Sequence, residues 1–292
     1  MGDSRVPTHV PFDESGFARW AIRWFKTHPS MPESDLSRRR FMTRSLAAGG
    51  PALLAATVLP GTAAEPGNEN AKPKALKIIC VGGHPDDPES GCAGTLTRYV
   101  EMGHSVTVIY LTRGERGIPG KSNDDAAAIR SLECEAACRI IGAKALFAGQ
   151  IDGSADFTRA RVDELKKMLA AEKPDIVFTH WPIDTHMDHQ VASMCTIRAA
   201  MALQPRPQLY FFEVNTGSQT QGFTPNTYVD VSPVLEKKKA ALLAHVSQNG
   251  EGVWRDHHEP IAIWRGREAG VKIAEAFVRL TRDNKNTSLP GL

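Results

Sequence analysis

One histidine and three carboxylates are crowded into the six residues HPDDPE, His84 to Glu89, directly after the apolar run KIICVGG. A second polar cluster, THWPIDTHMDHQ, follows the apolar run DIVF. This second cluster contains Asp184, His186, Asp188 and His189. Imidazole nitrogens and carboxylate oxygens are standard zinc ligands, and a catalytic zinc site combines three protein ligands with one open position. The two clusters therefore predict a metal-dependent catalytic site.

The spacing within each cluster constrains the roles. His84 and Asp87 lie three residues apart in a turn, so both can face one ion. The adjacent Asp86 and Asp87 should point in different directions, so one carboxylate can bind metal while the other faces metal-bound water. His186 and His189 are about one helical turn apart and can both face a cleft. Spacing alone does not decide which of these two histidines is the ligand.

Such a set of residues suits the hydrolysis of an amide. Zinc lowers the pKa of bound water to about 7 and polarises a carbonyl group. A carboxylate beside that water can act as general base, and a histidine across the site can stabilise the oxyanion and protonate the leaving nitrogen. An acid next to that histidine can hold its tautomer.

The chain around the clusters predicts alternating strands and helices. Strands are expected at 76–83, 105–112, 143–149, 175–180, 208–214 and, at an edge, 227–231. Helices are expected at 90–103, 124–142, 158–173, 187–203, 232–246 and 259–282. This pattern predicts an α/β class: a Rossmann-like, three-layer α/β/α fold with a mostly parallel sheet. Ligands bind such sheets where the strand order reverses, and a 2-1-4 order would make the two clusters face each other.

The two motifs, each after a strand, resemble those of the PIG-L/LmbE-like zinc-dependent de-N-acetylases. That family includes the deacetylases of glycosylphosphatidylinositol, mycothiol and bacillithiol synthesis. The resemblance covers residues 77–248 and includes LTRGERG (111–117) and IRSLECEAACRIIGA (129–143). It implies an LmbE-like fold and an enzyme that hydrolyses a linear amide, removing N-acetyl groups from an amino sugar or its conjugate.

The resemblance also implies a role for each matching residue. The implied metal ligands are His84, Asp87 and His189. The implied catalytic residues are Asp86 as general base, His186 as the histidine that stabilises or protonates, and Asp188 as its orienting acid. The implied substrate contacts are Arg130 and Asp152. Zn²⁺ is the implied cofactor, although Fe²⁺ accepts similar ligands. Met187 departs from the family, in which many members have proline.

Some polar residues allow two interpretations. Arg130 can instead pair with Glu133 on a solvated helix face. Arg113 and Arg116 of TRGERG can bind an acidic group of a substrate or remain solvated. His245 can reach the cleft or cap its helix.

Two further pairs favour structural interpretations. Cys134 and Cys138 share a face of an expected helix, which favours core packing over a disulfide or metal site. The five cysteines include no CxxC pair and form no disulfide framework. The pair His257–His258 is expected at the surface.

The bulk composition excludes some function classes. The 292 residues are 41% hydrophobic and 23% charged, which is enough for one sizeable core. A formal charge of +2 gives no electrostatic basis for a nucleic-acid partner. The first turn, VGGHPDD, lacks GxGxxG, which argues against a nicotinamide enzyme. A small molecule or glycan is the expected partner.

The N-terminal region predicts export. Residues 37–64 combine SRRRFMTRS, a weakly apolar run and the small residues of GTAAE, as in a twin-arginine (Tat) signal peptide. The apolar run is too short and too broken for a stable membrane span. We expect residues 1–36 to be an extension upstream of or around the true start, 65–75 a linker and 76–292 the deacetylase domain. The expected location is periplasmic or extracellular.

Two rival functions keep the same fold. One is a hydrolase that uses the same zinc site on a non-sugar N-acyl amide. The other is a non-catalytic carbohydrate-binding scaffold. The presence of Asp86, His186 and Asp188 argues against the second, because a binding module needs no general base.

Overall fold

The computed structural model describes residues 74–280 and 289–291. The expected N-terminal extension, the signal peptide and residues 65–73 of the expected linker lie outside the described residues. The described residues fall within one compact unit of the chain, 68–292. Within these ranges no helix has the length and apolarity needed to cross a membrane.

Seven strands of the described residues form one sheet in the order β3-β2-β1-β4-β5-β7-β6. They are β1 (Lys77–Gly82), β2 (Ser105–Tyr110), β3 (Lys144–Phe147), β4 (Ile176–His180), β5 (Gln208–Phe212), β6 (Thr227–Asp230) and β7 (Ala274–Arg279). Strands β1 to β5 are parallel, and β7 is antiparallel to both of its neighbours. The expected mostly parallel sheet is confirmed, and so is the 2-1-4 order, because β1 lies between β2 and β4.

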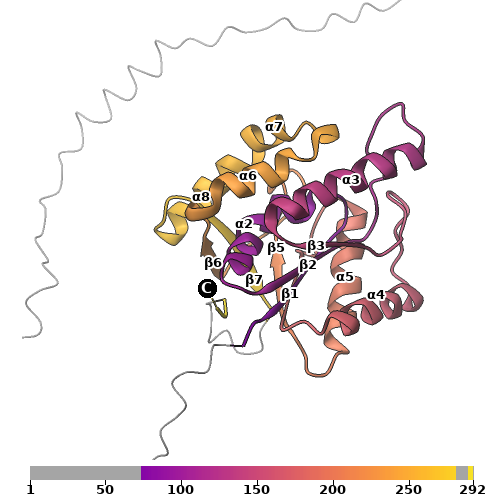
Figure 1. Ribbon diagram of the computed structural model, residues 1–292, viewed down its shortest axis with the longest axis horizontal. Coiled ribbons are helices and arrows are strands. Elements are labelled where there is room, and N and C mark those ends of the chain that lie inside the picture. Colours follow the sequence, from indigo (N-terminus) through magenta and orange to yellow (C-terminus); the bar gives the residue numbers. More distant parts are fainter. Residues whose placement is uncertain (1–73, 281–288, 292) are drawn as a thin grey trace, which may run out of the picture. The chain divides into compact units, whose positions relative to one another are not determined.

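Helices cover both faces of this sheet, as Figure 1 shows. They are α2 (Asp87–Glu101), α3 (Asn123–Ile141), α4 (Arg159–Glu172), α5 (Met187–Met201), α6 (Leu235–Leu243), α7 (Gly250–Val253) and α8 (Glu259–Ala269). One core packs α2, α3, α6 and α8 against the sheet, and a second core packs α4 and α5 against the opposite face. The three-layer α/β/α expectation is therefore confirmed.

The helix after HPDDPE begins earlier than expected. It was expected to begin at residue 90, but α2 begins at Asp87, so HPDDPE provides its first turn. Pro88 suits this place because its missing N–H would have no partner in a first helical turn. Glu89 and Asp87 then lie at the positive end of the helix dipole. The polar cluster is thus the junction between β1 and α2.

The C-terminal part also differs from the expectation. Residues 259–282 were expected to be helical, but α8 ends at Ala269 and Gly270 takes a left-handed conformation (φ 72°). Strand β7 follows and lies between β5 and β6. The helix expected at 232–246 begins as a 3₁₀ turn, Ser232–Val234, before α6. The short segment AEAFVR forms a strand because its backbone pairs with both β5 and β6. These strands are distant in the sequence, so the local pattern of residues does not reveal the pairing.

A buried ion pair ties α6 and β7 to α2. Glu275 accepts hydrogen bonds from the main-chain N–H groups of Gly94 (2.8 Å) and Thr95 (2.7 Å). Lys238 donates to the Ser90 carbonyl oxygen (2.8 Å) and to Glu275 Oε1 (2.6 Å). Both charged side chains are buried. The pair therefore fixes the helix whose first turn carries the polar cluster.

The substitution Lys238→Met is expected to lower the free energy of unfolding by about 3–5 kcal/mol, because it leaves Glu275 buried and unpaired. The neighbouring Lys237 provides a matched control. It contacts Glu101 at 2.6 Å on the surface, so Lys237→Met is expected to cost less than about 1 kcal/mol. Urea unfolding followed by circular dichroism measures both losses. Equal losses of unfolding free energy in the two variants would contradict a stabilising role of the buried Lys238–Glu275 pair.

Candidate metal centre and active site

The two polar clusters meet at the carboxyl ends of β1 and β4. His84 and Asp87 come from the junction between β1 and α2, and His189 comes from the first turn of α5. All three side chains line a pocket of about 490 Å³. Gly83 allows this close approach, because a Cβ atom there would lie 3.0 Å from the His189 ring. The predicted position at the reversal of strand order is therefore confirmed.

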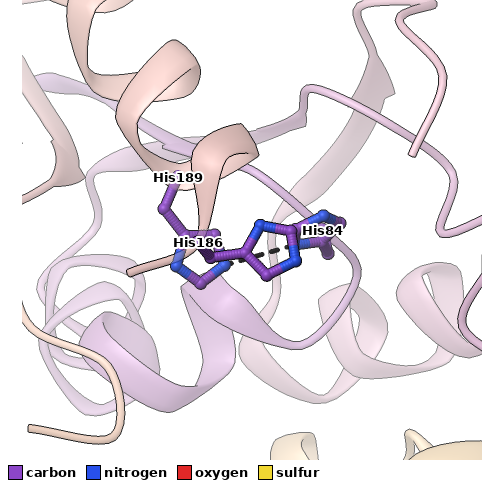
Figure 2. Close-up of side chains that lie close together, drawn as sticks. All are labelled: His84, His186 and His189. Carbon is purple, nitrogen blue, oxygen red and sulfur yellow. Dashed lines mark hydrogen bonds between the residues drawn. The ribbon is translucent and has the colours of Figure 1, made fainter. Parts of the chain in front are cut away.

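Three donor atoms converge at the base of this pocket. His84 Nδ1 lies 3.2 Å from His189 Nε2, and Figure 2 shows these two rings turned toward each other. Asp87 Oδ2 lies 3.3 Å from each of these nitrogens. Ligand atoms about 2.0–2.1 Å from a tetrahedral zinc ion lie about 3.3–3.4 Å from one another. The triangle of donor atoms therefore fits a zinc-sized ion without rearrangement.

Carboxylates hold the outer nitrogen of each of these two imidazoles. Asp184 Oδ1 lies 3.1 Å from His189 Nδ1. Asp188 Oδ2 and Asp152 Oδ1 lie 3.1 Å and 3.3 Å from His84 Nε2. A carboxylate at the outer nitrogen keeps the proton there and leaves the inner lone pair free for a metal ion. This arrangement supports His84 and His189 as ligands.

Two other histidines lie near the triangle but suit the ligand role less well. His180, the last residue of β4, is buried, and its Nε2 accepts a hydrogen bond from the Gly83 N–H at 3.0 Å. His186 is half-buried, and its Nδ1 accepts the N–H of Asp188 at 3.3 Å, which caps α5. Because these lone pairs are already engaged, we favour His189 in the choice that spacing left open.

His186 is placed to act as a hydrogen-bond donor. The cap holds Nδ1 as the acceptor, so the neutral ring carries its proton on Nε2. Burial, together with the neighbouring His84, lowers the pKa of His186 and favours this neutral form. Its ring centroid lies 4.5 Å from that of His84 (Figure 2). A neutral imidazole here can donate to an oxygen of a bound molecule.

Asp188 does not contact His186 in the way that was expected. It was expected to orient His186 through its carboxylate, but only its main-chain N–H contacts that ring. The carboxylate turns away and accepts the Gly153 N–H at 2.6 Å and contacts His84 at 3.1 Å. The cause is the helix start, because a capping residue bonds the N–H two residues later. Asp188 therefore orients His84.

Asp86 lies beside the triangle in an unusual backbone conformation. Its φ of 93° and ψ of −25° are uncommon for a residue other than glycine, and such strain often occurs at functional sites. The Asp86 carboxylate contacts Arg130, whereas the Asp87 carboxylate contacts His84 and His189. Burial raises the pKa of Asp86 to about 6, against the opposing effect of Arg130. A carboxylate with such a pKa is a stronger base than an ordinary aspartate.

Arg130 holds Asp86 in place. Its Nη2 donates to the Pro85 carbonyl oxygen (2.6 Å) and lies 3.3 Å from Asp86 Oδ2. Gly114 and Gly117 make room for it, because a Cβ atom on either would overlap the guanidinium group. The alternative of a solvated Arg130–Glu133 pair is wrong: Arg130 is buried. The glycines of TRGERG thus leave space for the side chain of Arg130, which belongs to the neighbouring helix α3.

The structure also locates an aspartate and three histidines that the sequence analysis considered. Asp152 lines the pocket and accepts the Arg116 N–H at 3.1 Å. His245 is buried, with its Nε2 3.4 Å from Glu89 Oε2; it is not among the residues that line the pocket, and its side chain makes no capping hydrogen bond. His257 is exposed, as expected, but the surface expectation is wrong for His258, which is buried at the pocket wall.

The cysteines are structural. All five are buried and unpaired: Cys80, Cys92, Cys134, Cys138 and Cys195. The predicted core packing of Cys134 and Cys138 is confirmed. None of the five belongs to a group of potential metal ligands within the described ranges.

Comparisons with known proteins place this site in a family. The family model described as PIG-L, GlcNAc-PI de-N-acetylase, matches residues 79–200, a range that contains both polar clusters. The diacetylchitobiose deacetylase of Thermococcus kodakarensis is 31% identical over 219 residues, which cover 69% of this chain and 82% of that protein.

The fold comparison agrees. The structure of the N,N'-diacetylchitobiose deacetylase from Pyrococcus horikoshii superposes with a TM-score of 0.62 at 27% identity, covering 70% of this chain and 84% of that one. One relative carries a different name: the 4-oxalmesaconate hydratase of Pseudomonas putida is 25% identical over 223 residues, which cover 68% of this chain and 85% of that protein.

Proposed function

Because the chain belongs to the PIG-L family of de-N-acetylases, which are amide hydrolases, we propose that it is an exported zinc enzyme that removes an N-acetyl group from an amino sugar or its conjugate. The observation that carries the proposal is the pocket base. There a triangle of potential ligands, a carboxylate of raised pKa and a neutral imidazole donor surround one small volume.

We assign the metal to His84, Asp87 and His189, whose donor atoms converge. Bound there, Zn²⁺ would polarise the acyl carbonyl and make water more acidic. Zinc is the default for two imidazoles and one carboxylate, and Fe²⁺ accepts the same ligands. Asp184 and Asp188 hold the outer nitrogens of the two imidazoles.

The chain's other residues divide the proton transfers. Asp86 accepts the proton of the attacking water, and Arg130 keeps its carboxylate directed into the pocket. His186 donates its Nε2–H to the carbonyl oxygen as negative charge develops there. The water oxygen bonds to the carbonyl carbon, the C–N bond then breaks, and the proton that Asp86 accepted passes to the leaving nitrogen, which gives acetate and a free amine. Asp152, in the pocket lining, is placed to accept hydrogen bonds from sugar hydroxyl groups.

The amino-sugar substrate is supported by two of the similar proteins, which are diacetylchitobiose deacetylases. A pocket of about 490 Å³ is of the usual size for a small-molecule site. A non-sugar N-acyl amide, a hydration reaction and binding without turnover are the alternatives. Export rests on residues 37–64 alone, and cell fractionation tests it.

The test is to load the purified protein with zinc and measure acetate and free amine from a panel of N-acetylated mono- and disaccharides and non-sugar N-acetyl amines. Equimolar acetate and amine from the sugars is the expected result. Turnover of the non-sugar amides alone would contradict the amino-sugar substrate and favour a non-sugar N-acyl amide. Tight sugar binding without acetate release, with metal bound, would contradict the enzymatic proposal.

A further inference from the structure

The two arginines of TRGERG lie in different surroundings. Both side chains are exposed, but Arg113 does not line the pocket and has its Nε 3.5 Å from Glu115 Oε1. Arg116 lines the pocket that contains the metal-binding triangle. Sequence alone left both arginines as either solvated residues or contacts for an acidic group. The structure separates them, because only Arg116 faces the space that a substrate would occupy.

The guanidinium group of Arg116 is held in place by neutral acceptors. Its Nη1 donates to the Gly153 carbonyl oxygen at 3.1 Å, and its Nη2 donates to Ser154 Oγ at 2.8 Å. Gly153, with φ 67°, allows this contact, because a Cβ atom there would lie 2.8 Å from Nη1. A side chain fixed in this way loses little further conformational entropy when it binds a ligand.

The positive charge of Arg116 has no carboxylate partner within 4.0 Å among the described residues. The pocket's other arginine, Arg130, faces Asp86 at 3.3 Å. Asp152 accepts the main-chain N–H of Arg116, but its carboxylate is directed to His84. Arg116 therefore brings a positive charge to the pocket that no acidic side chain neutralises directly.

The rest of the wall is suited to neutral hydroxyl groups. It includes the side chains of Ser90, Asn215, Gln219 and Gln248. Hydroxyl and amide groups can both donate to and accept from sugar hydroxyls. A substrate that matches the whole pocket would therefore combine a polyhydroxylated ring with one anionic group near Arg116.

We propose that Arg116 forms an anion subsite, and that the preferred substrates are N-acetylated sugars that carry a carboxylate or a phosphate group. The inference rests on the proposed function and narrows its substrate class. A guanidinium group binds both anions through paired, charge-assisted hydrogen bonds. Asp152 joins the subsite to the metal centre, since it contacts both the Arg116 N–H and His84. The anion would thus lie close to the scissile amide.

The experiment compares three substrates: N-acetylglucosamine, N-acetylglucosamine 6-phosphate and N-acetylmuramic acid, which carries a carboxylate. The zinc-loaded protein is expected to show a kcat/KM at least about 10-fold higher for an anionic sugar than for the neutral one. Arg116→Gln should lower kcat/KM for that anionic sugar by about 10- to 100-fold and leave the neutral sugar within about 3-fold. Arg116→Lys, which keeps the charge, should restore part of the loss.

Arg113→Gln is the matched control, because it removes a guanidinium group from the same loop outside the pocket. It is expected to leave all three substrates unchanged. If only the phosphorylated sugar is preferred, the substrates are sugar phosphates. If only N-acetylmuramic acid is preferred, the substrates are sugars that carry a carboxylate. Equal kcat/KM on all three sugars, or the same loss in both glutamine variants, would overturn the anion subsite.

Binding of the deacetylated products separates this inference from the proposed function. Calorimetry with glucosamine, glucosamine 6-phosphate and muramic acid reports the subsite without any turnover. Arg116-dependent binding of an anionic product with no acetate release from any sugar would support the subsite and contradict the deacetylase proposal. Acetate release that depends neither on Arg116 nor on the charge of the substrate would support the deacetylase proposal and contradict the anion subsite.

Discussion

Asp86→Asn is expected to lower kcat by about 10²–10⁴-fold while the protein keeps its fold and its metal. Asparagine has the same shape and tolerates the positive φ of 93° at this position better than most residues. It cannot accept the proton that the carboxylate takes from water. The measurement combines acetate release, metal content per chain by mass spectrometry and a thermal melt.

Asp86→Gly separates the catalytic role from the backbone strain. Glycine adopts a φ of 93° without the steric cost that any other residue has there. Asp86→Gly and Asp86→Ala both leave the buried Arg130 without its carboxylate partner, but only alanine keeps the strained φ. The glycine variant should therefore be inactive and more resistant to heat than Asp86→Ala. An Asp86→Asn variant with full activity, or a glycine variant that unfolds at a lower temperature than Asp86→Ala, would contradict the assignment.

The fold and the convergence of the site were predictable because they depend on local pattern. Strands β1 and β4 are short apolar runs, and a polar cluster begins within four residues of the end of each strand. In a parallel sheet with the observed order, the carboxyl ends of neighbouring strands must meet. The loop that carries His84 and Asp87 therefore has to face the loop that carries His186 and His189.

The contacts around the ligands were not predictable, because they join residues far apart in the chain. Asp188 was expected to contact His186, its neighbour in sequence, and it contacts His84 instead. Asp184 lies in the second cluster, but nothing in its spacing assigned it to the outer nitrogen of His189. The position of His180 at the end of β4 was the only signal for this buried residue.

Glycine positions illustrate the same limit. The sequence TRGERG resembles the family, but the sequence does not say what its glycines accommodate. In the structure both lie against the guanidinium group of Arg130, which in turn holds Asp86. A residue can thus matter to catalysis by leaving space for a side chain on another element. Only the packing of the loop against α3 reveals that relation.

His189→Ala is expected to abolish stoichiometric metal binding and, with it, all measurable activity. His189 is one of the three side chains of the triangle, and its loss leaves His84 and Asp87 with two donor atoms, fewer than the three of a catalytic zinc site. Removing a carboxylate that only orients a ligand typically weakens metal binding by 10- to 100-fold, so losing a ligand should cost more. The measurement is metal content per chain after dialysis against a weak chelator.

His186→Asn is the matched comparison, because this residue lies in the same loop and its ring lies 4.6 Å from that of His189. Asparagine is a good N-terminal helix cap, so it keeps the bond to the Asp188 N–H that His186 now makes. The variant should retain about one metal ion per chain and lose about 10²-fold or more in kcat, because only the donor to the carbonyl oxygen is gone. If His186→Asn loses the metal and His189→Ala keeps it, the two histidines exchange roles, and His84, Asp87 and His186 become the ligands.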